Sequence, residues 1–241
     1  MSAQGGFRRP PQPLFDVTSC GIQASADSSE TADKQREREP PVRRPVPRMV
    51  RSVPPASALH LPISDNLSAT MPAAPPLPRV GISSCLLGEP VRYDGGHRKQ
   101  PALLEEFSGQ VEWVASCPEA ELGLGVPRET IQIEVADGAL RLMTHDTRRD
   151  ITDPMIAWAR RRAAALAAQN IAGYVFKARS PSCGVGSVAV VGGAADGTGL
   201  FAAELIRRLP DLPVVDEDQL ATRSARQAFL QQVRRYAKSA V

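Results

Sequence analysis

The sequence predicts an α/β protein with a three-layer, mostly parallel, Rossmann-like sheet covered by helices on both faces and preceded by a disordered N-terminal segment. Three observations lead to this prediction. The composition changes at residue 79, because 14 of the 22 prolines lie in residues 1–78. Beyond that point the chain contains short, β-branched apolar runs of the kind that form buried strands. Helical patterns separate these runs, and such alternation is typical of a parallel sheet.

Residues 1–78 combine prolines, arginine pairs and acidic residues with almost no periodic apolar run. Such a segment cannot bury enough surface to offset its ordering entropy, so we expect a disordered linker. Residues 36–48 could instead serve as a polyproline ligand or basic docking arm. Another alternative is that translation begins at Met71, which would make the upstream part an over-long gene model. The α/β domain is expected to span residues 79–241.

The first part of this domain is predicted to form a strand, a helix and a second strand. Residues 79–84, "RVGISS", form an apolar run closed by small residues. Residues 101–109 have proline in the first turn and glycine at the exit, which favours a helix. Residues 110–116, "QVEWVAS", repeat the strand pattern.

A hairpin and a long helix follow. Residues 131–135 and 139–143 are apolar runs separated by "ADG", which predicts an inserted hairpin. Residues 150–170 open with Asp and Thr and are rich in alanine, leucine and arginine, so we expect a helix.

The C-terminal part continues the alternation. Strands are predicted at residues 171–178, 187–193 and 212–217. Helices are predicted at residues 197–209, which open with glycines, and at residues 218–240.

Charge and hydropathy give no support to several classes of protein. The net charge is only +3, from 29 basic and 26 acidic side chains, so no nucleic-acid footprint is evident. The apolar runs are far shorter than the roughly 20 residues that a membrane-spanning helix needs. Residues 1–25 contain no apolar signal core, and the four cysteines are not densely spaced. We therefore expect a cytoplasmic protein with no membrane association.

Three of the cysteines follow the carboxyl ends of predicted strands. Cys85, Cys117 and Cys183 come directly or shortly after the strands at 79–84, 110–116 and 171–178. These ends share one edge in a parallel sheet, where open α/β sheets bind ligands. A single buried cysteine is most often a small hydrophobe, but three in glycine-, proline- and serine-containing loops predict a common site.

The cysteine pattern favours an iron–sulfur cluster over a zinc site or a redox dithiol. The chain contains no CxxC pair and no histidine in zinc-finger spacing. Three thiolates from separate loops suit a cluster of iron and sulfide, which normally takes four cysteines. With three ligands one iron remains open, and an open metal position can bind and activate a substrate atom.

Three segments resemble the signature blocks of the DUF523 family: "SSCLLGEPVRYDGG" at 83–96, "CPEAELGLGVPRE" at 117–129 and "KARSPSCG" at 177–184. This family includes enzymes of the 2-thiouracil desulfidase type. The resemblance covers about residues 79–218. It implies a 4Fe-4S cluster held by Cys85, Cys117 and Cys183. Cys20 belongs to no block.

The resemblance implies a hydrolytic, redox-neutral desulfidase. The thiocarbonyl sulfur of a small thiolated substrate would bind the open iron, which polarises the carbon for attack by water. The alternative is a non-catalytic module for iron–sulfur sensing or sulfur transfer. A structural zinc domain is a more distant alternative. Only the enzyme needs a general base beside its metal.

Candidate residues for the remaining roles come from the same blocks. Glu119 is the first candidate for the general base and Asp94 the second. Ser182 is assigned a catalytic role and Ser180 a substrate-binding one; both hydroxyls could donate to cluster sulfides or to the base, or simply cap the loop.

Basic side chains in these blocks are candidates for substrate binding. Lys177 and Arg92 would hold a ring oxygen or a phosphate, and Arg179 could contribute as well. The alternative is that each pairs with a nearby carboxylate.

Overall fold

The computed structural model describes residues 76–239. The prediction of disorder for residues 1–78 therefore falls almost entirely outside the described residues, as does Cys20. The strands are β1 Arg79–Ser83, β2 Glu112–Ser116, β3 Ile131–Ala136, β4 Ala139–Thr144, β5 Ile171–Phe176, β6 Val190–Val191 and β7 Val214–Asp216. The helices are α1 Ser84–Leu87, α2 Pro101–Glu106, α3 Pro118–Glu121, α4 Thr152–Ala168, α5 Leu200–Arg208 and α6 Arg223–Ser239, with a 3₁₀ turn at Glu217–Leu220.

The main sheet has four parallel strands in the order β2-β1-β5-β7. Strand β1 pairs with β2 in the register Val80↔Trp113 and with β5 in the register Gly81↔Tyr174. The chain thus leaves β1 toward one side to form β2 and later returns on the other side to form β5. The predicted parallel α/β fold is confirmed.

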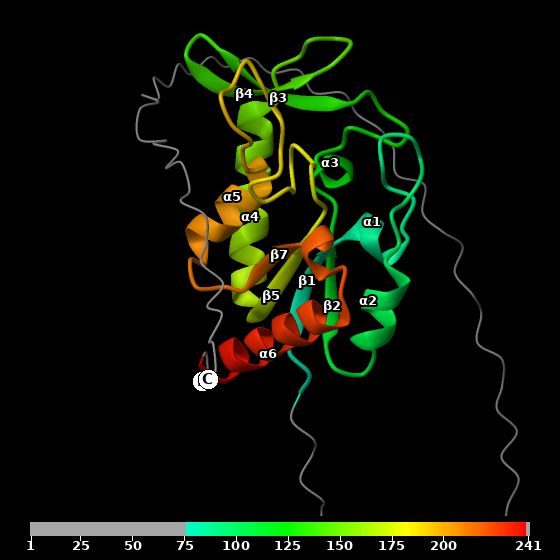
Figure 1. Cartoon of the computed structure of the whole chain (residues 1–241). Coiled ribbons are helices and arrows are strands. Elements are labelled where there is room, and N and C mark those ends of the chain that lie inside the picture. The colour runs from blue at the N-terminus through cyan, green and yellow to red at the C-terminus, as the bar shows by residue number, and fades with distance from the viewer. Residues whose placement is uncertain (1–75, 240–241) are drawn as a thin grey trace, which may run out of the picture. The chain divides into compact units, whose positions relative to one another are not determined.

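Helices cover both faces of this sheet, as Figure 1 shows. On one face, Tyr174 and Phe176 stack with ring centroids 4.1 Å apart and pack edge-on against Phe201 of α5. On the other face, Val175 belongs to a second apolar cluster with Phe229 of α6. Adjacent residues of β5 therefore feed two separate cores, which explains why the whole strand is buried.

The hairpin β3–β4 belongs to a second sheet of three strands in the order β4-β3-β6. The prediction of a hairpin is confirmed. The strand predicted at 187–193 is wrong in length, because only Val190–Val191 is extended, and it pairs with β3 in place of the main sheet. Gly192 and Gly193 follow it, and Gly192 adopts a positive φ of 75°, which ends the strand.

A glycine in β1 is required by close packing. A Cβ on Gly81 would lie 2.1 Å from Cδ2 of Tyr174, whose ring is fully buried. We expect Gly81→Ala to lower the free energy of unfolding by about 3 kcal/mol, because the ring has no room to move. Urea unfolding of the two proteins measures this difference, and equal midpoints would contradict it.

The topology places a crevice at the carboxyl edge of β1. In open α/β sheets, ligands bind where the chain connections after two adjacent strands run to opposite sides of the sheet. Strand β1 lies at such a point, because β2 and β5 flank it. Within residues 76–239, no helix combines the length and the apolar character that a bilayer crossing requires.

Candidate functional site

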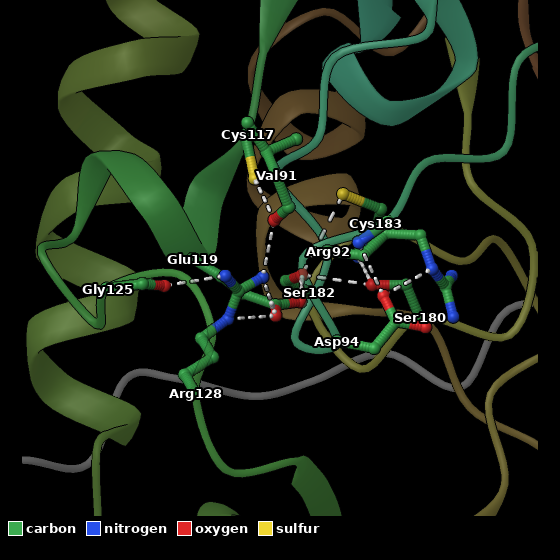
Figure 2. Close-up of polar contacts among 11 residues, drawn as sticks. Val91, Arg92, Asp94, Cys117, Glu119, Gly125, Arg128, Ser180, Ser182 and Cys183 are labelled. Carbon is green, nitrogen blue, oxygen red and sulfur yellow. Dashed lines mark hydrogen bonds and ion pairs between the residues drawn. The ribbon is translucent and has the colours of Figure 1, made fainter.

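A cavity of about 560 Å³ opens at the carboxyl edge of the main sheet. Cys85, Cys117 and Cys183 all line it, and all three are free thiols. They come from positions after β1, β2 and β5, three adjacent strands. Figure 2 shows Cys117 and Cys183 with the polar groups between them.

Each cysteine is fixed by short local structure. Cys85 lies in the single turn of α1 and accepts, through its carbonyl, hydrogen bonds from Gly88 and Arg98. Cys117 is the N-cap of α3, with its N–H donating to Glu121 at 2.9 Å. Cys183 sits in a turn that begins at Ser180, whose carbonyl accepts from the Cys183 N–H at 3.1 Å.

The thiols are strongly desolvated. Burial raises the pKa of Cys85 to about 11, with a further increase from Cys117. Burial also raises the pKa of Cys183 well above its ordinary value, and a hydrogen bond from Ser83 opposes that rise only in part. The pKa of Cys117 is likewise raised by burial. Without a bound cation these groups are therefore neutral thiols at pH 7 to 8.

This desolvation predicts slow alkylation of the metal-free protein. Because the thiolate is the nucleophile, Cys85 at pH 8 should react with iodoacetamide at least about tenfold more slowly than in the urea-unfolded chain. A raised pKa moves the rise in rate to higher pH, so the folded rate should still climb above pH 9. Mass spectrometry of the labelled peptides measures both rates, and equal rates in the two states would contradict the burial described here.

A buried ion pair forms beside the thiols. Arg128 donates to Oε2 of Glu119 from both Nε, at 3.0 Å, and Nη2, at 2.6 Å. The same guanidinium donates to the carbonyls of Gly125 and Val91, so it is fully held. Oε1 of Glu119 accepts a hydrogen bond from Ser182 at 2.8 Å. Glu119, the first candidate base, thus lines the cavity as an oriented carboxylate (Figure 2).

Two serines connect this carboxylate to Cys183. The Ser182 hydroxyl lies 3.0 Å from that of Ser180 and 3.8 Å from Sγ of Cys183. Since Ser182 donates to Glu119, its oxygen can accept from Ser180. Both serines line the cavity. The structure therefore arranges Ser180, Ser182 and Glu119 as one continuous hydrogen-bonded chain.

The basic candidates also line the cavity, each beside a carboxylate. Lys177 pairs with Glu217 and donates to the carbonyl of Ala178 at 3.1 Å. Arg92 lies over the ring of Tyr93, and its Nε is 3.4 Å from Asp94. That Nε is buried and makes no hydrogen bond to any residue between 76 and 239, whereas the Lys177 ammonium makes two.

Asp94, the second candidate base, does not line the cavity. It is exposed, and Oδ1 accepts from the Gly96 N–H at 2.9 Å. This hydrogen bond and the nearby Arg92 lower the pKa of Asp94. Asp94 therefore matches the role of a base in this cavity less well than Glu119, which lines it.

Sequence reasoning missed two residues that shape the site. Arg128 lies in the same sequence block as Glu119. A buried carboxylate needs a cationic partner, and this need could have identified Arg128 as the partner of Glu119. Glu217 follows the carboxyl end of β7 directly, so the rule that selected the cysteines could have selected it too.

The donor set fits a polynuclear metal group. Among residues 76–239, no three His, Cys, Asp or Glu side chains are grouped closely enough to ligate a single metal ion. In an iron–sulfur cluster each thiolate binds a different iron, so the thiols converge on one cavity without converging on one point. Three soft thiols on one cavity, two of them buried and that of Cys117 half-buried, match this requirement better than they match one zinc ion.

A protein family and a solved structure match this chain. The sequence profile of the family described as 2-thiouracil desulfurase matches residues 80–217. A solved structure described as a 4Fe-4S-dependent thiouracil desulfidase is 31% identical, over 59% of this chain and 93% of that chain, with a TM-score of 0.48. Among curated proteins, none matches this chain.

Proposed function

The chain belongs to the 2-thiouracil desulfurase family, and on that premise we propose that it is a desulfidase that hydrolyses the C=S bond of a small thiolated substrate such as 2-thiouracil. Water supplies the oxygen, the ring carbon becomes a carbonyl and sulfur leaves as hydrogen sulfide. No electron is transferred overall. The single observation that carries the proposal is the meeting of three free thiols and the Glu119 carboxylate in one cavity.

Cys85, Cys117 and Cys183 would hold a 4Fe-4S cluster through their thiolates. When bound by three cysteines, such a cluster supplies an open, thiophilic iron that polarises a C=S bond. Loading requires the thiols to lose their protons. Because burial raises their pKa values, this loss needs a higher pH than for an exposed cysteine.

Glu119 is proposed to accept the proton of the attacking water. Its Oε2 is occupied by Arg128, whereas Oε1 accepts one hydrogen bond from Ser182 and retains capacity for another. The Arg128 guanidinium keeps the carboxylate aimed at the cavity. Ser182 and Ser180 can then carry a proton between Oε1 and the region of Cys183 through their 3.0 Å contact.

Lys177 and Arg92 are proposed to orient the substrate. The Lys177 ammonium is anchored by Glu217 and so presents a fixed charge at the cavity wall. Among residues 76–239 the buried Nε of Arg92 makes no hydrogen bond beyond its 3.4 Å ion-pair contact with Asp94, and a ring oxygen or nitrogen could provide an acceptor. Ser182 and Cys183 form a buried part of the cavity wall.

Anaerobic reconstitution with iron and sulfide, followed by gel filtration and incubation with 2-thiouracil, tests this function. We expect uracil and sulfide in equal amounts, with multiple turnovers per chain. Iron uptake without sulfide release would support the alternative, a sensing or sulfur-transfer module. Sulfide release by the metal-free protein would contradict the assigned role of the thiols.

A further inference from the structure

One loop carries much of the site but little regular structure. Residues 177–188 leave β5 and supply Lys177, Ser180, Ser182 and Cys183 to the cavity. The segment runs through turns and bends, without a helix or strand of its own. Its geometry must therefore be fixed by contacts from neighbouring elements.

The last strand of the sheet provides such contacts through Asp216. Its side chain is only 3% exposed. The carboxylate accepts from the Val185 N–H, at 3.1 Å to Oδ1 and 3.3 Å to Oδ2, and from the Ser187 hydroxyl at 2.6 Å. The Ser187 oxygen in turn accepts from the N–H of Arg179 at 3.1 Å. The Asp216 carboxylate thus bonds the loop directly after Cys183 and, through the Ser187 hydroxyl, is linked to Arg179 before it.

The neighbouring Glu217 holds the start of the same loop. It is 7% exposed, pairs with Lys177 and accepts from the N–H of Ala178. Glu217 is therefore compensated by a cation, whereas no ion pair is formed by Asp216 among the described residues. Desolvation raises the pKa of Asp216 to about 6; Glu217 adds to the rise, and Lys177 and the hydrogen bonds from Ser187 and Val185 oppose it.

Burying a carboxylate without a cation costs stability, and its hydrogen bonds to the loop, together with its capping box with Gln219 at the start of the 3₁₀ turn, offset that cost. We propose that Asp216, acting through Val185 and Ser187, is the positioning residue that holds Cys183 and Ser182 in the geometry needed to retain the cluster. This inference rests on the proposed function. Asp216 touches neither substrate nor cluster in this account. Its effect is indirect, like that of other outer residues that orient metal ligands.

The rate of iron release from the reconstituted protein tests the proposal. It is measured with a chelator that becomes coloured when it binds ferrous iron. Asp216→Asn keeps the shape but loses one acceptor oxygen, and Ser187→Ala removes the relay to Arg179. Both variants should release iron about 10-fold faster or more than the unaltered chain. Ser187→Thr retains the hydroxyl and should restore the slow rate.

A matched control separates positioning from general destabilisation. Glu204 is also a buried carboxylate, 6% exposed, but it lies on α5, pairs with Arg160 and Arg207, and does not line the cavity. Glu204→Gln should lower the unfolding midpoint without speeding iron release. Acceleration of equal size in Glu204→Gln and Asp216→Asn would overturn the proposal.

Hydrogen exchange keeps the test independent of cluster loading. In the metal-free full chain, peptides from residues 177–188 should exchange faster in Asp216→Asn than in the unaltered chain. In Glu204→Gln their exchange rate should equal that of the unaltered chain. Unchanged exchange in Asp216→Asn would refute the inference. If the unaltered chain holds iron but releases no sulfide from 2-thiouracil, the proposed function fails, while both comparisons still decide the role of Asp216.

Discussion

Replacement of Cys183 by alanine is expected to abolish both iron retention and sulfide release. Cys183 is buried and lines the cavity, and no other cysteine within residues 76–239 can substitute, because Cys85 and Cys117 line it at positions of their own. A cluster with only two thiolate ligands exposes two irons and is lost readily. Activity should therefore fall to the rate without protein.

Iron and acid-labile sulfide assays after anaerobic reconstitution measure this loss. Cys85→Ala and Cys117→Ala should behave like Cys183→Ala. Cys20→Ala is the matched control, since Cys20 lies outside the segment that matches the family, and it should retain full iron and activity. A site variant that keeps both would show that its cysteine is not a ligand.

Replacement of Glu119 by glutamine should leave the cluster in place and lower kcat by about 10²- to 10⁴-fold, the range that a general base contributes. The amide cannot accept a proton from water, and it leaves the Arg128 guanidinium without its charged partner. Loss of kcat with retained iron separates a proton-transfer role from a structural one. Iron content and steady-state sulfide release, measured on the same sample, report both quantities.

Two further carboxylates provide controls for Glu119. Glu112→Gln alters an exposed residue of β2 that pairs with Arg79, and should match the unaltered chain. Asp94→Asn should cause a small change, because Asp94 lies outside the cavity. A large loss in Asp94→Asn together with a normal Glu119→Gln would reverse the assignment of the base.

The positions of the cysteines were predictable because they follow from topology. A run such as "RVGIS" is too apolar for any place except a buried strand, and the carboxyl ends of parallel strands share one edge. Predicting that Cys85, Cys117 and Cys183 lie close to one cavity therefore required no knowledge of side-chain packing. The same reasoning yielded β2 and β5.

The ion-pair partners of the site residues could not be predicted, because they depend on distances between loops. Glu119 pairs with Arg128 nine residues away, and Lys177 with Glu217 forty residues away. Asp94 is absent from the cavity lining, and its carboxylate accepts a hydrogen bond from the nearby Gly96 N–H. The short strand β6 is set by its pairing with β3, a contact that its own sequence does not encode.

In the proposed function, three cysteine thiolates hold an iron–sulfur cluster whose open iron receives the sulfur of the substrate. ⁵⁷Fe Mössbauer spectroscopy of the anaerobically reconstituted chain, with and without 2-thiouracil, tests it most directly. We expect a 4Fe-4S spectrum in which one iron site changes when the substrate binds. A protein that hydrolyses 2-thiouracil while all its iron sites remain unchanged, or while it contains no iron, would contradict the account.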